Sequence, residues 1–250
     1  MEFYVLASGS KGNATFVYED HTGILIDCGI SKRQLNIKLN SLGYDMDDIN
    51  YVLLTHDHSD HNKNIHIFDE DLVYSSRGNI AGLDDDHILE PYTYKQLGCF
   101  KIFILRTSHD ASDPIGFIFE SKEKLLYLTD TGYVTKKNRA YLHDLDYYII
   151  ESNHDVEMLM KTRRPQYLKQ RILGDKGHLS NEYSATLMSE MIGKHTKEII
   201  LAHLSQEANT REKALATYNQ VFDDKGVIFD RDHIKVASQV EIVIGGHNED

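Results

Sequence analysis

The seven residues THDHSDH contain three imidazoles and two carboxylates, and four of these side chains are candidate metal ligands: His56, His58, Asp60 and His61. Imidazoles and carboxylates crowded into one short loop repel one another, or must be desolvated, unless a cation lies among them. Alternate side chains of an extended segment point to the same side, so His56 and His58 can share one ion. Asp60 and His61 then turn toward a second position as the chain leaves the strand. The loop therefore predicts part of a metal centre.

Three more donors stand alone at the ends of apolar runs: His109 after FILRTS, Asp130 after LLYLT and His203 after IILA. Seven donors of this kind suit a binuclear site, in which a carboxylate bridges two ions about 3.5–4 Å apart. Imidazole and carboxylate donors without a thiolate fit Zn, Mn or Fe. We therefore expect two divalent metal ions per chain.

The elements that must position these donors are mainly strands. Apolar runs predict strands at residues 3–8, 13–19, 22–29, 49–56, 71–76, 100–109, 115–121, 124–130, 145–152, 198–203, 227–230 and 239–246. Helices are expected at residues 31–44, with Ser31 as N-cap and Gly43 at the end, and at about 155–173, 181–194 and 210–222.

Many of these strands run apolar and then end in a charged or imidazole residue, and loops at strand ends are where sites usually form. We expect one rim to carry Asp27, His56, His109, Asp130 and His203. Sheet runs flanked by helices, with antiparallel stretches between them, indicate an α/β fold of two sheets covered by helices on both outer faces, a four-layer αββα sandwich.

Composition predicts a single domain over residues 1–250, because no Gly/Ser-rich linker divides the chain. No apolar run approaches the roughly 20 residues that span a bilayer, and no signal peptide is recognisable. Two cysteines suggest no disulfide framework, so we expect a cytoplasmic protein with no membrane association. No obligate protein partner can be inferred.

The formal net charge of −12 argues against polyanionic partners. However, the segment from Lys161 to His178 holds six Lys/Arg and a single acid, Asp175. Such a run is a solvated helix face or a surface for a polyanion. The sequence leaves both readings open.

The pattern HxHxDH in THDHSDH, with LIDCG before it and His109, TDTG and LAHLS after it, resembles the metallo-β-lactamase-fold hydrolase superfamily over essentially the whole chain. The resemblance implies an αββα sandwich with the metals at one edge of the two sheets. It implies ligands for one ion at His56, His58 and His109, ligands for the other at Asp60, His61 and His203, and a bridge at Asp130. Asp27 is then an acceptor that orients a ligand histidine.

Further motifs, ASGSKGNATFV, LTHDHSDH, ESNHD and GHLSN, are similar to the WalJ/YycJ-type subfamily, which is associated with DNA exonuclease activity and mismatch repair. The oxygen donor at Asp130, where one large class of zinc β-lactamases has Cys, favours phosphodiesters. GHLSN also resembles the extra histidine motif of nuclease-like members. We therefore expect a binuclear phosphodiesterase or nuclease that acts on DNA, and the subfamily resemblance implies a 5′-3′ exonuclease linked to DNA repair.

In this reading the metals lower the pKa of a shared water, and the resulting hydroxide attacks phosphorus. Asp60 would orient the nucleophile, and His178 would protonate or shield the departing oxygen. His178 could equally sit in a helix-entry loop. Substrate contacts are assigned to the SGSKGN turn and to the two later motifs, with loop or helix geometry as the alternative explanation: Ser8, Ser10, Lys11, Asn13, His154, Ser180 and Asn181.

The alternative enzyme is a small-molecule hydrolase of the same fold, either a cyclic phosphodiesterase or a thioesterase of the glyoxalase II kind. Too few residues separate Asp130 from His203 for the added domain of β-CASP nucleases. Flavodiiron members characteristically have Glu where His58 stands. A scaffold without catalysis would have lost ligands, and none of the seven is missing.

Overall fold

The computed structural model describes residues 1–246. Contacts divide this part of the chain into two compact units. Unit 1 comprises residues 1–106, 111–123 and 238–246, and unit 2 comprises residues 107–110 and 124–237. No helix within residues 1–246 combines the length and the apolar character needed to cross a membrane.

Unit 1 contains a six-stranded mixed sheet of order β13-β1-β2-β3-β4-β5. Its strands β13, β1, β2 and β3 pair antiparallel, whereas β3, β4 and β5 pair parallel. The bounds are β1 (Glu2–Ala7), β2 (Ala14–Glu19), β3 (Thr22–Ile26), β4 (Tyr51–Leu54), β5 (Val73–Ser75) and β13 (Val243–Gly245). Because β3 and β4 are parallel, the loops that follow them leave the same edge of the sheet.

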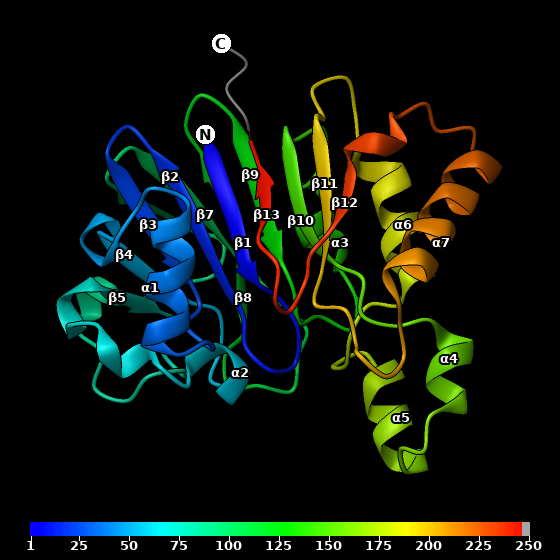
Figure 1. Ribbon diagram of the computed structural model, residues 1–250, viewed down its shortest axis with the longest axis horizontal. Coiled ribbons are helices and arrows are strands. Elements are labelled where there is room, and N and C mark those ends of the chain that lie inside the picture. Colours follow the sequence, from blue (N-terminus) through cyan, green and yellow to red (C-terminus); the bar gives the residue numbers. More distant parts are fainter. Residues whose placement is uncertain (247–250) are drawn as a thin grey trace. The chain divides into compact units, whose positions relative to one another are not determined.

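Helix α1 (Lys32–Ser41) lies beside this sheet (Figure 1). Ser31 caps it by accepting a hydrogen bond from the backbone N–H of Gln34, whose side chain bonds back to the cap. Leu35 and Leu39 are fully buried in the core of unit 1, and each such burial contributes about 1.5–3 kcal/mol. The predicted helix, its cap and the turn at Gly43, with φ +88°, are confirmed.

Three more strands of unit 1 pair antiparallel in the order β6-β7-β8: β6 (Tyr94–Leu97), β7 (Phe100–Arg106) and β8 (Ile115–Glu120). The sequence did not predict β6, because its residues are largely polar and its side chains are mostly exposed. The turn at Gly98, with φ +53°, folds β6 back onto β7.

Unit 2 contains four parallel strands that pair in the order β12-β11-β10-β9. They are β9 (Lys124–Leu128), β10 (Tyr147–Glu151), β11 (Glu198–Ala202) and β12 (Ile234–Val236). Strands β9, β10 and β11 are almost wholly buried, as strands covered on both faces are. Their carboxyl ends lie at one edge, which brings together the residues that follow them.

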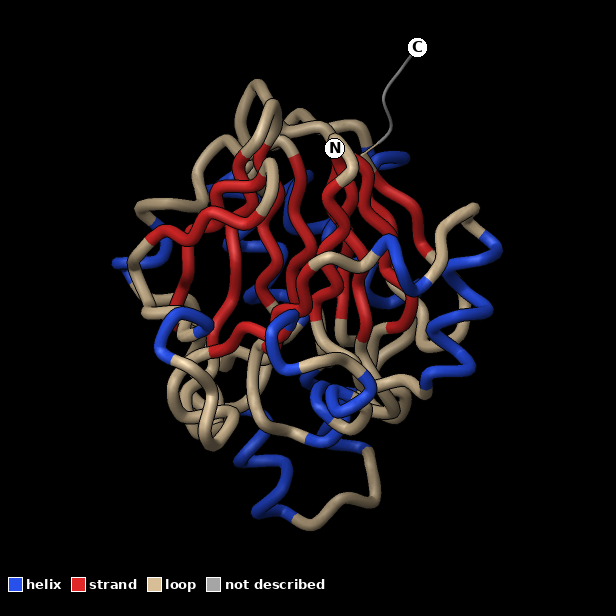
Figure 2. Tube along the Cα trace, turned by 90° about the vertical axis from the view of Figure 1, so that its left-hand side faces the viewer, coloured by secondary structure: helices blue, strands red, loops and turns tan. Residues whose placement is uncertain are grey.

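The helices of unit 2 are α3 (Lys136–Arg139), α4 (Val156–Lys161), α5 (Gln166–Leu173), α6 (Asn181–Met191) and α7 (Arg211–Asp224). Helices α6 and α7 lie side by side, and α4 and α5 lie beyond the carboxyl ends of the parallel strands (Figures 1 and 2). The predicted helical region at 155–173 is thus two helices, since the chain turns at residues 162–165, where Pro165 precedes α5.

One predicted strand is wrong. Residues 227–230 form no strand, and Ile228 is fully exposed there. Strand β12 follows a few residues later and pairs with β11. The reason is that Ile234 and Val236 of β12 are buried, so this run gains burial that Val227–Asp230 does not.

Candidate metal centre

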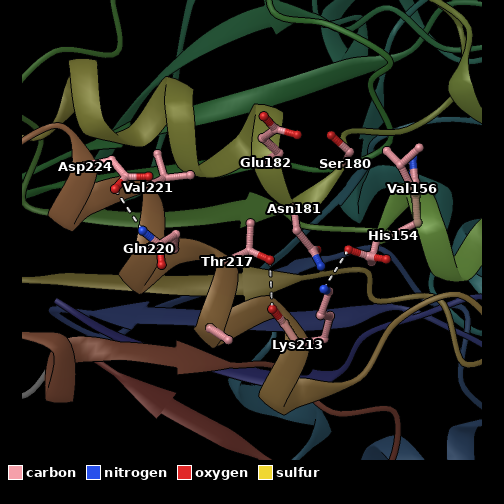
Figure 3. Close-up of a pocket in the computed structure, with 12 residues that line it drawn as sticks. His154, Val156, Ser180, Asn181, Glu182, Lys213, Thr217, Gln220, Val221 and Asp224 are labelled. Atoms are coloured by element: carbon pink, nitrogen blue, oxygen red, sulfur yellow. Dashed lines mark hydrogen bonds and ion pairs between the residues drawn. The ribbon is translucent and has the colours of Figure 1, made fainter.

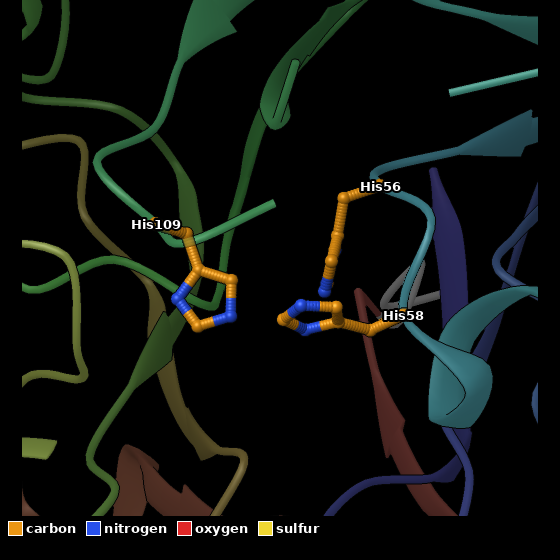
Figure 4. A group of neighbouring side chains, drawn as sticks. All are labelled: His56, His58 and His109. Carbon is orange, nitrogen blue, oxygen red and sulfur yellow. The ribbon is translucent and has the colours of Figure 1, made fainter. Parts of the chain in front are cut away.

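The THDHSDH loop of unit 1 begins where β4 ends. His58 directly precedes the short helix α2 (Ser59–Asn62), which carries Asp60 and His61. The rings of His56 and His58 lie close together (Figure 4), with centroids 4.7 Å apart, and those of His56 and His61 are 4.1 Å apart. Asp57 is bound elsewhere, because its Oδ2 accepts a hydrogen bond from Ser112 Oγ at 2.6 Å. The loop thus gathers three imidazoles and leaves the intervening carboxylate outside.

A buried carboxylate fixes the orientation of these imidazoles. Asp27, at the end of β3, accepts a hydrogen bond from His61 Nδ1 at 2.7 Å and bonds from the backbone N–H and the hydroxyl of Thr55 at 2.8 and 2.9 Å. The Thr55 hydroxyl in turn lies 3.0 Å from His56 Nδ1. With Nδ1 held in this way, Nε2 of each ring is the atom suited to a metal, which is the arrangement around metal-binding histidines in general.

The SGSKGN turn, residues 8–13, is hydrogen-bonded to the THDHSDH loop. Asn13 accepts a hydrogen bond from the Gly9 backbone N–H at 2.8 Å, and its own backbone N–H donates to the Asp60 carbonyl at 2.8 Å. Ser8 is buried, whereas Ser10 and Lys11 are exposed. Asn13 therefore has a structural role in holding Asp60, and Ser10 and Lys11 are the residues of this turn that solvent can reach.

In unit 2 the parallel strands bring together Asp130, Glu151, His178 and His203, whose ligand-type atoms lie within 4.8 Å of one another. Asp130 follows β9, Glu151 ends β10 and His203 follows β11. Asp130 Oδ1 lies 3.4 Å from His203 Nδ1 and 3.7 Å from His178 Nδ1. Such a set of carboxylates and imidazoles is suited to a divalent cation.

Glu151 is the centre of this cluster and was absent from the residues assigned to the site by sequence. Its Oε1 accepts hydrogen bonds from His178 Nδ1 at 2.7 Å and from His203 Nδ1 at 3.0 Å. Its Oε2 accepts from the backbone N–H groups of Thr131 and Leu179 at 3.0 and 3.1 Å. Burial acts to raise the pKa of Glu151, but the charge and hydrogen bond of His178, with the hydrogen bond of His203, lower it to about 2. Glu151 thus remains an anion that orients two imidazoles.

His109 is held in a similar way. Its Nδ1 N–H donates to the Gly177 carbonyl, 3.0 Å away, and its Nε2 lies 3.7 Å from Asp130 Oδ1. Burial lowers the pKa of His109, which favours the neutral imidazole that metals bind. Asp110 lies beside the same nitrogen, with its Oδ1 3.4 Å from His109 Nε2.

Three of the residues predicted for the site have left-handed backbone conformations, with φ +62° at Asp27, +53° at Asp130 and +57° at His203. Each follows a strand of its own unit. Such a conformation costs a non-glycine residue about 1–3 kcal/mol and is concentrated at functional sites. The strain marks these three strand ends as positions where the side-chain direction matters.

The later substrate assignments lie at a different place in unit 2. His154, Ser180 and Asn181 line a pocket of about 390 Å³ beside α6 and α7 (Figure 3). Ser180 caps α6, and the Asn181 amide, which is buried, bonds to Asn209 at 2.9 Å. Ser180 and Asn181 therefore have structural roles, whatever they contact in a substrate.

Comparison with known proteins places these features in a family. A model of the β-lactamase superfamily domain matches residues 22–204, which run through both units. The chain is 36% identical over 240 residues to exodeoxyribonuclease YycJ of Bacillus anthracis, with 90% of each chain covered. It is 35% identical over 231 residues to exodeoxyribonuclease WalJ of Streptococcus pneumoniae, with 86% of each covered. The chain belongs to the β-lactamase superfamily.

Within this superfamily, the predicted resemblance to WalJ and YycJ is confirmed. The fold is that of metallo-β-lactamase proteins: the structure matches YhfI of Bacillus subtilis with a TM-score of 0.72 over 98% of this chain and 99% of that one, at 17% identity. The predicted α/β sandwich class is therefore correct, and the protein is a hydrolase. Glu151 could have been found from the sequence, because the run YYIIES ends in a polar residue as the other site strands do.

Proposed function

We propose that this protein is a metal-dependent exodeoxyribonuclease that hydrolyses phosphodiester bonds of DNA. The observation that carries the proposal is His178, an imidazole held by Glu151 beside Asp130 and His203. The ligand assignment leaves this imidazole available to protonate a leaving oxygen. The names of the relatives YycJ and WalJ support DNA as the substrate. The finer expectations, 5′-3′ polarity and a place in DNA repair, belong to the same proposal.

The seven predicted ligands, His56, His58, Asp60, His61, His109, Asp130 and His203, are proposed to hold two divalent ions, with Asp130 as the bridge. The proposal is supported by hydrogen bonds within each unit that orient its ligand histidines. Asp27 orients His61 in unit 1, and the Gly177 carbonyl and Glu151 orient His109 and His203 in unit 2. When bound, the metals would supply Lewis-acid stabilisation of the phosphate and a more acidic water. Zn, Mn and Fe all fit the donors.

The protein's own groups then have separate tasks. His178 holds its proton-transferring Nε2 toward the substrate because Nδ1 is bound to Glu151. Proton transfer of this kind contributes about 10²–10⁴-fold to turnover. Asp60, fixed through its backbone by Asn13, orients the attacking oxygen. The two units are proposed to form one domain, in which these groups act together.

The proposal is tested with metal-reconstituted protein, end-labelled single- and double-stranded DNA and RNA, and Mn²⁺ or Zn²⁺. We expect a ladder from one end of DNA, and the labelled end reports polarity. His178→Ala should retain its metal and lose about 10²–10⁴-fold in turnover. His143→Ala is the matched control, because His143 is an exposed histidine of the same unit. Absence of cleavage of every nucleic acid would refute the function.

The small-molecule alternative makes a different prediction about salt. Binding to a nucleic acid releases the cations that are condensed on its phosphates. This release is less favourable at high salt, so the binding weakens steeply as salt rises. A KM that does not respond to salt would favour a small substrate.

A further inference from the structure

The cationic segment Lys161–His178 is less available than its sequence suggests. Four of its six cations are used within unit 2: Lys161 pairs with Glu157, Arg164 Nε lies 3.0 Å from Glu207, Arg171 pairs with Asp110, and the buried Lys169 donates to the Met160 carbonyl at 2.6 Å. Arg163 and Lys176 are exposed and form no ion pair with any residue of the described chain, 1–246. Within residues 1–246, only these two of the six cations therefore have no ion pair or hydrogen bond that ties them to the protein.

An aromatic ring stands on the same segment. Tyr167, on α5, has 73% of its surface exposed. Arg171 lies one turn further along α5 and is also exposed, so the two share one face of the helix. The opposite face is anchored, because Ile172 packs with Leu159 and Ala208. The exposed face is thus presented by a fixed helix.

Contacts at the end of α5 connect this exposed face with the cluster of Asp130, Glu151, His178 and His203. Arg171 pairs with Asp110, the neighbour of His109. The Ile172 carbonyl at the end of α5 accepts a hydrogen bond from the His178 backbone N–H at 3.0 Å. The backbone that follows α5 packs tightly against the loop after β9, since a Cβ added at Gly132 in that loop would collide with the Asp175 carbonyl. Lys176 therefore lies on a segment fixed against the loop that carries Asp130.

We propose that three exposed side chains, Tyr167 on α5, Arg163 before the helix and Lys176 after it, form a surface that binds a single strand of the DNA substrate. A base stacks on Tyr167, and Arg163 and Lys176 neutralise phosphates. The inference rests on the proposed function and names the form of nucleic acid it takes. Exposed aromatic rings beside cations are the general means of binding single strands, because every base has a face that can stack. A duplex offers phosphates to the cations but no free base face to Tyr167.

The test compares Tyr167→Ala, Tyr167→Phe and the control Tyr141→Ala, an exposed tyrosine outside this surface. Kd is measured by fluorescence anisotropy with a short labelled single strand whose phosphorothioate linkages resist cleavage. Tyr167→Ala should raise Kd by about 5- to 150-fold, the equivalent of about 1–3 kcal/mol of base stacking. Tyr167→Phe should bind as the wild type does, since it keeps the ring. Circular dichroism verifies that each variant is folded.

The cations are tested through salt dependence. Arg163→Gln should reduce the slope of log Kd against log salt by about 0.7, the value for one phosphate contact with a single strand. Lys194→Gln is the control, because Lys194 is an exposed cation of unit 2 outside this surface.

Three results would overturn the inference: an unchanged Kd for Tyr167→Ala, an equal loss in Tyr141→Ala, or an equal loss for duplex and single strand. Failure of the proposed function is recognised separately, as wild-type protein that binds the strand yet cleaves neither DNA nor bis(p-nitrophenyl) phosphate.

Discussion

Replacement of His154 by Phe should make the protein less sensitive to acid. His154 has only 1% of its surface exposed, and neither ring nitrogen has a hydrogen-bond partner within the described residues 1–246. Burial lowers the pKa of His154 from 6.5 to about 4. Phe fills a similar volume with no nitrogen to desolvate, and an unsatisfied buried polar group costs about 1–3 kcal/mol.

The sign follows from which state binds the proton. Well above pH 6.5 His154 is neutral in both states and adds no pH dependence. As the pH falls from 6.5 toward 4, the unfolded chain takes up the proton and the folded chain does not, so the free energy of unfolding decreases. The difference between 6.5 and about 4 corresponds to about 3 kcal/mol when complete. At about pH 5 the same relation gives a loss of about 2 kcal/mol.

The assay is urea unfolding of wild type and His154→Phe, each at about pH 7 and about pH 5, with linear extrapolation to water. The wild type should lose about 2 kcal/mol more than the variant between these pH values. Contributions from other groups and from metal release occur in both proteins and cancel in the difference. His143→Phe, at an exposed position, should behave as the wild type does. The same pH dependence in wild type and His154→Phe would refute the reasoning.

Four further changes have expected outcomes. Glu151→Gln should lower turnover by at least about 10²-fold and metal affinity by about 10–100-fold, because the amide is uncharged and keeps only one acceptor oxygen for the donors that now bond to both oxygens of Glu151, among them His178 and His203; metal titration and single-turnover kinetics check both, and wild-type values would contradict the role of Glu151. Asp27→Asn should weaken metal binding by about 10–100-fold through His61, and an unchanged affinity would exclude this anchoring role. Treatment with EDTA should abolish phosphodiesterase activity and Mn²⁺ or Zn²⁺ should restore it, whereas activity that survives complete metal removal would argue against a metal-dependent reaction. Ile228→Ser should change the free energy of unfolding by less than about 0.5 kcal/mol, since Ile228 is fully exposed, and a larger loss would indicate that this segment is packed.

The sequence alone determined the features that depend on near neighbours. The apolar runs gave most strands, and the Ser31 cap and the turn at Gly43 defined α1, because these signals act within a few residues. The crowding of His56, His58 and His61 was equally visible, since all three lie in one short loop. Local spacing was sufficient for these conclusions, and it carried the family resemblance as well.

Only the tertiary structure decided which distant groups meet. Glu151 orients His178 and His203, which lie 27 and 52 residues away, because the parallel order of β9, β10 and β11 brings their carboxyl ends to one edge. Arg164 and Arg171 likewise form ion pairs with acids remote in sequence. Charge counted along the chain therefore overstated the number of cations free of protein partners. Strand β12 was also decided this way, since pairing with β11 and burial, which no local pattern encodes, selected residues 234–236 over 227–230.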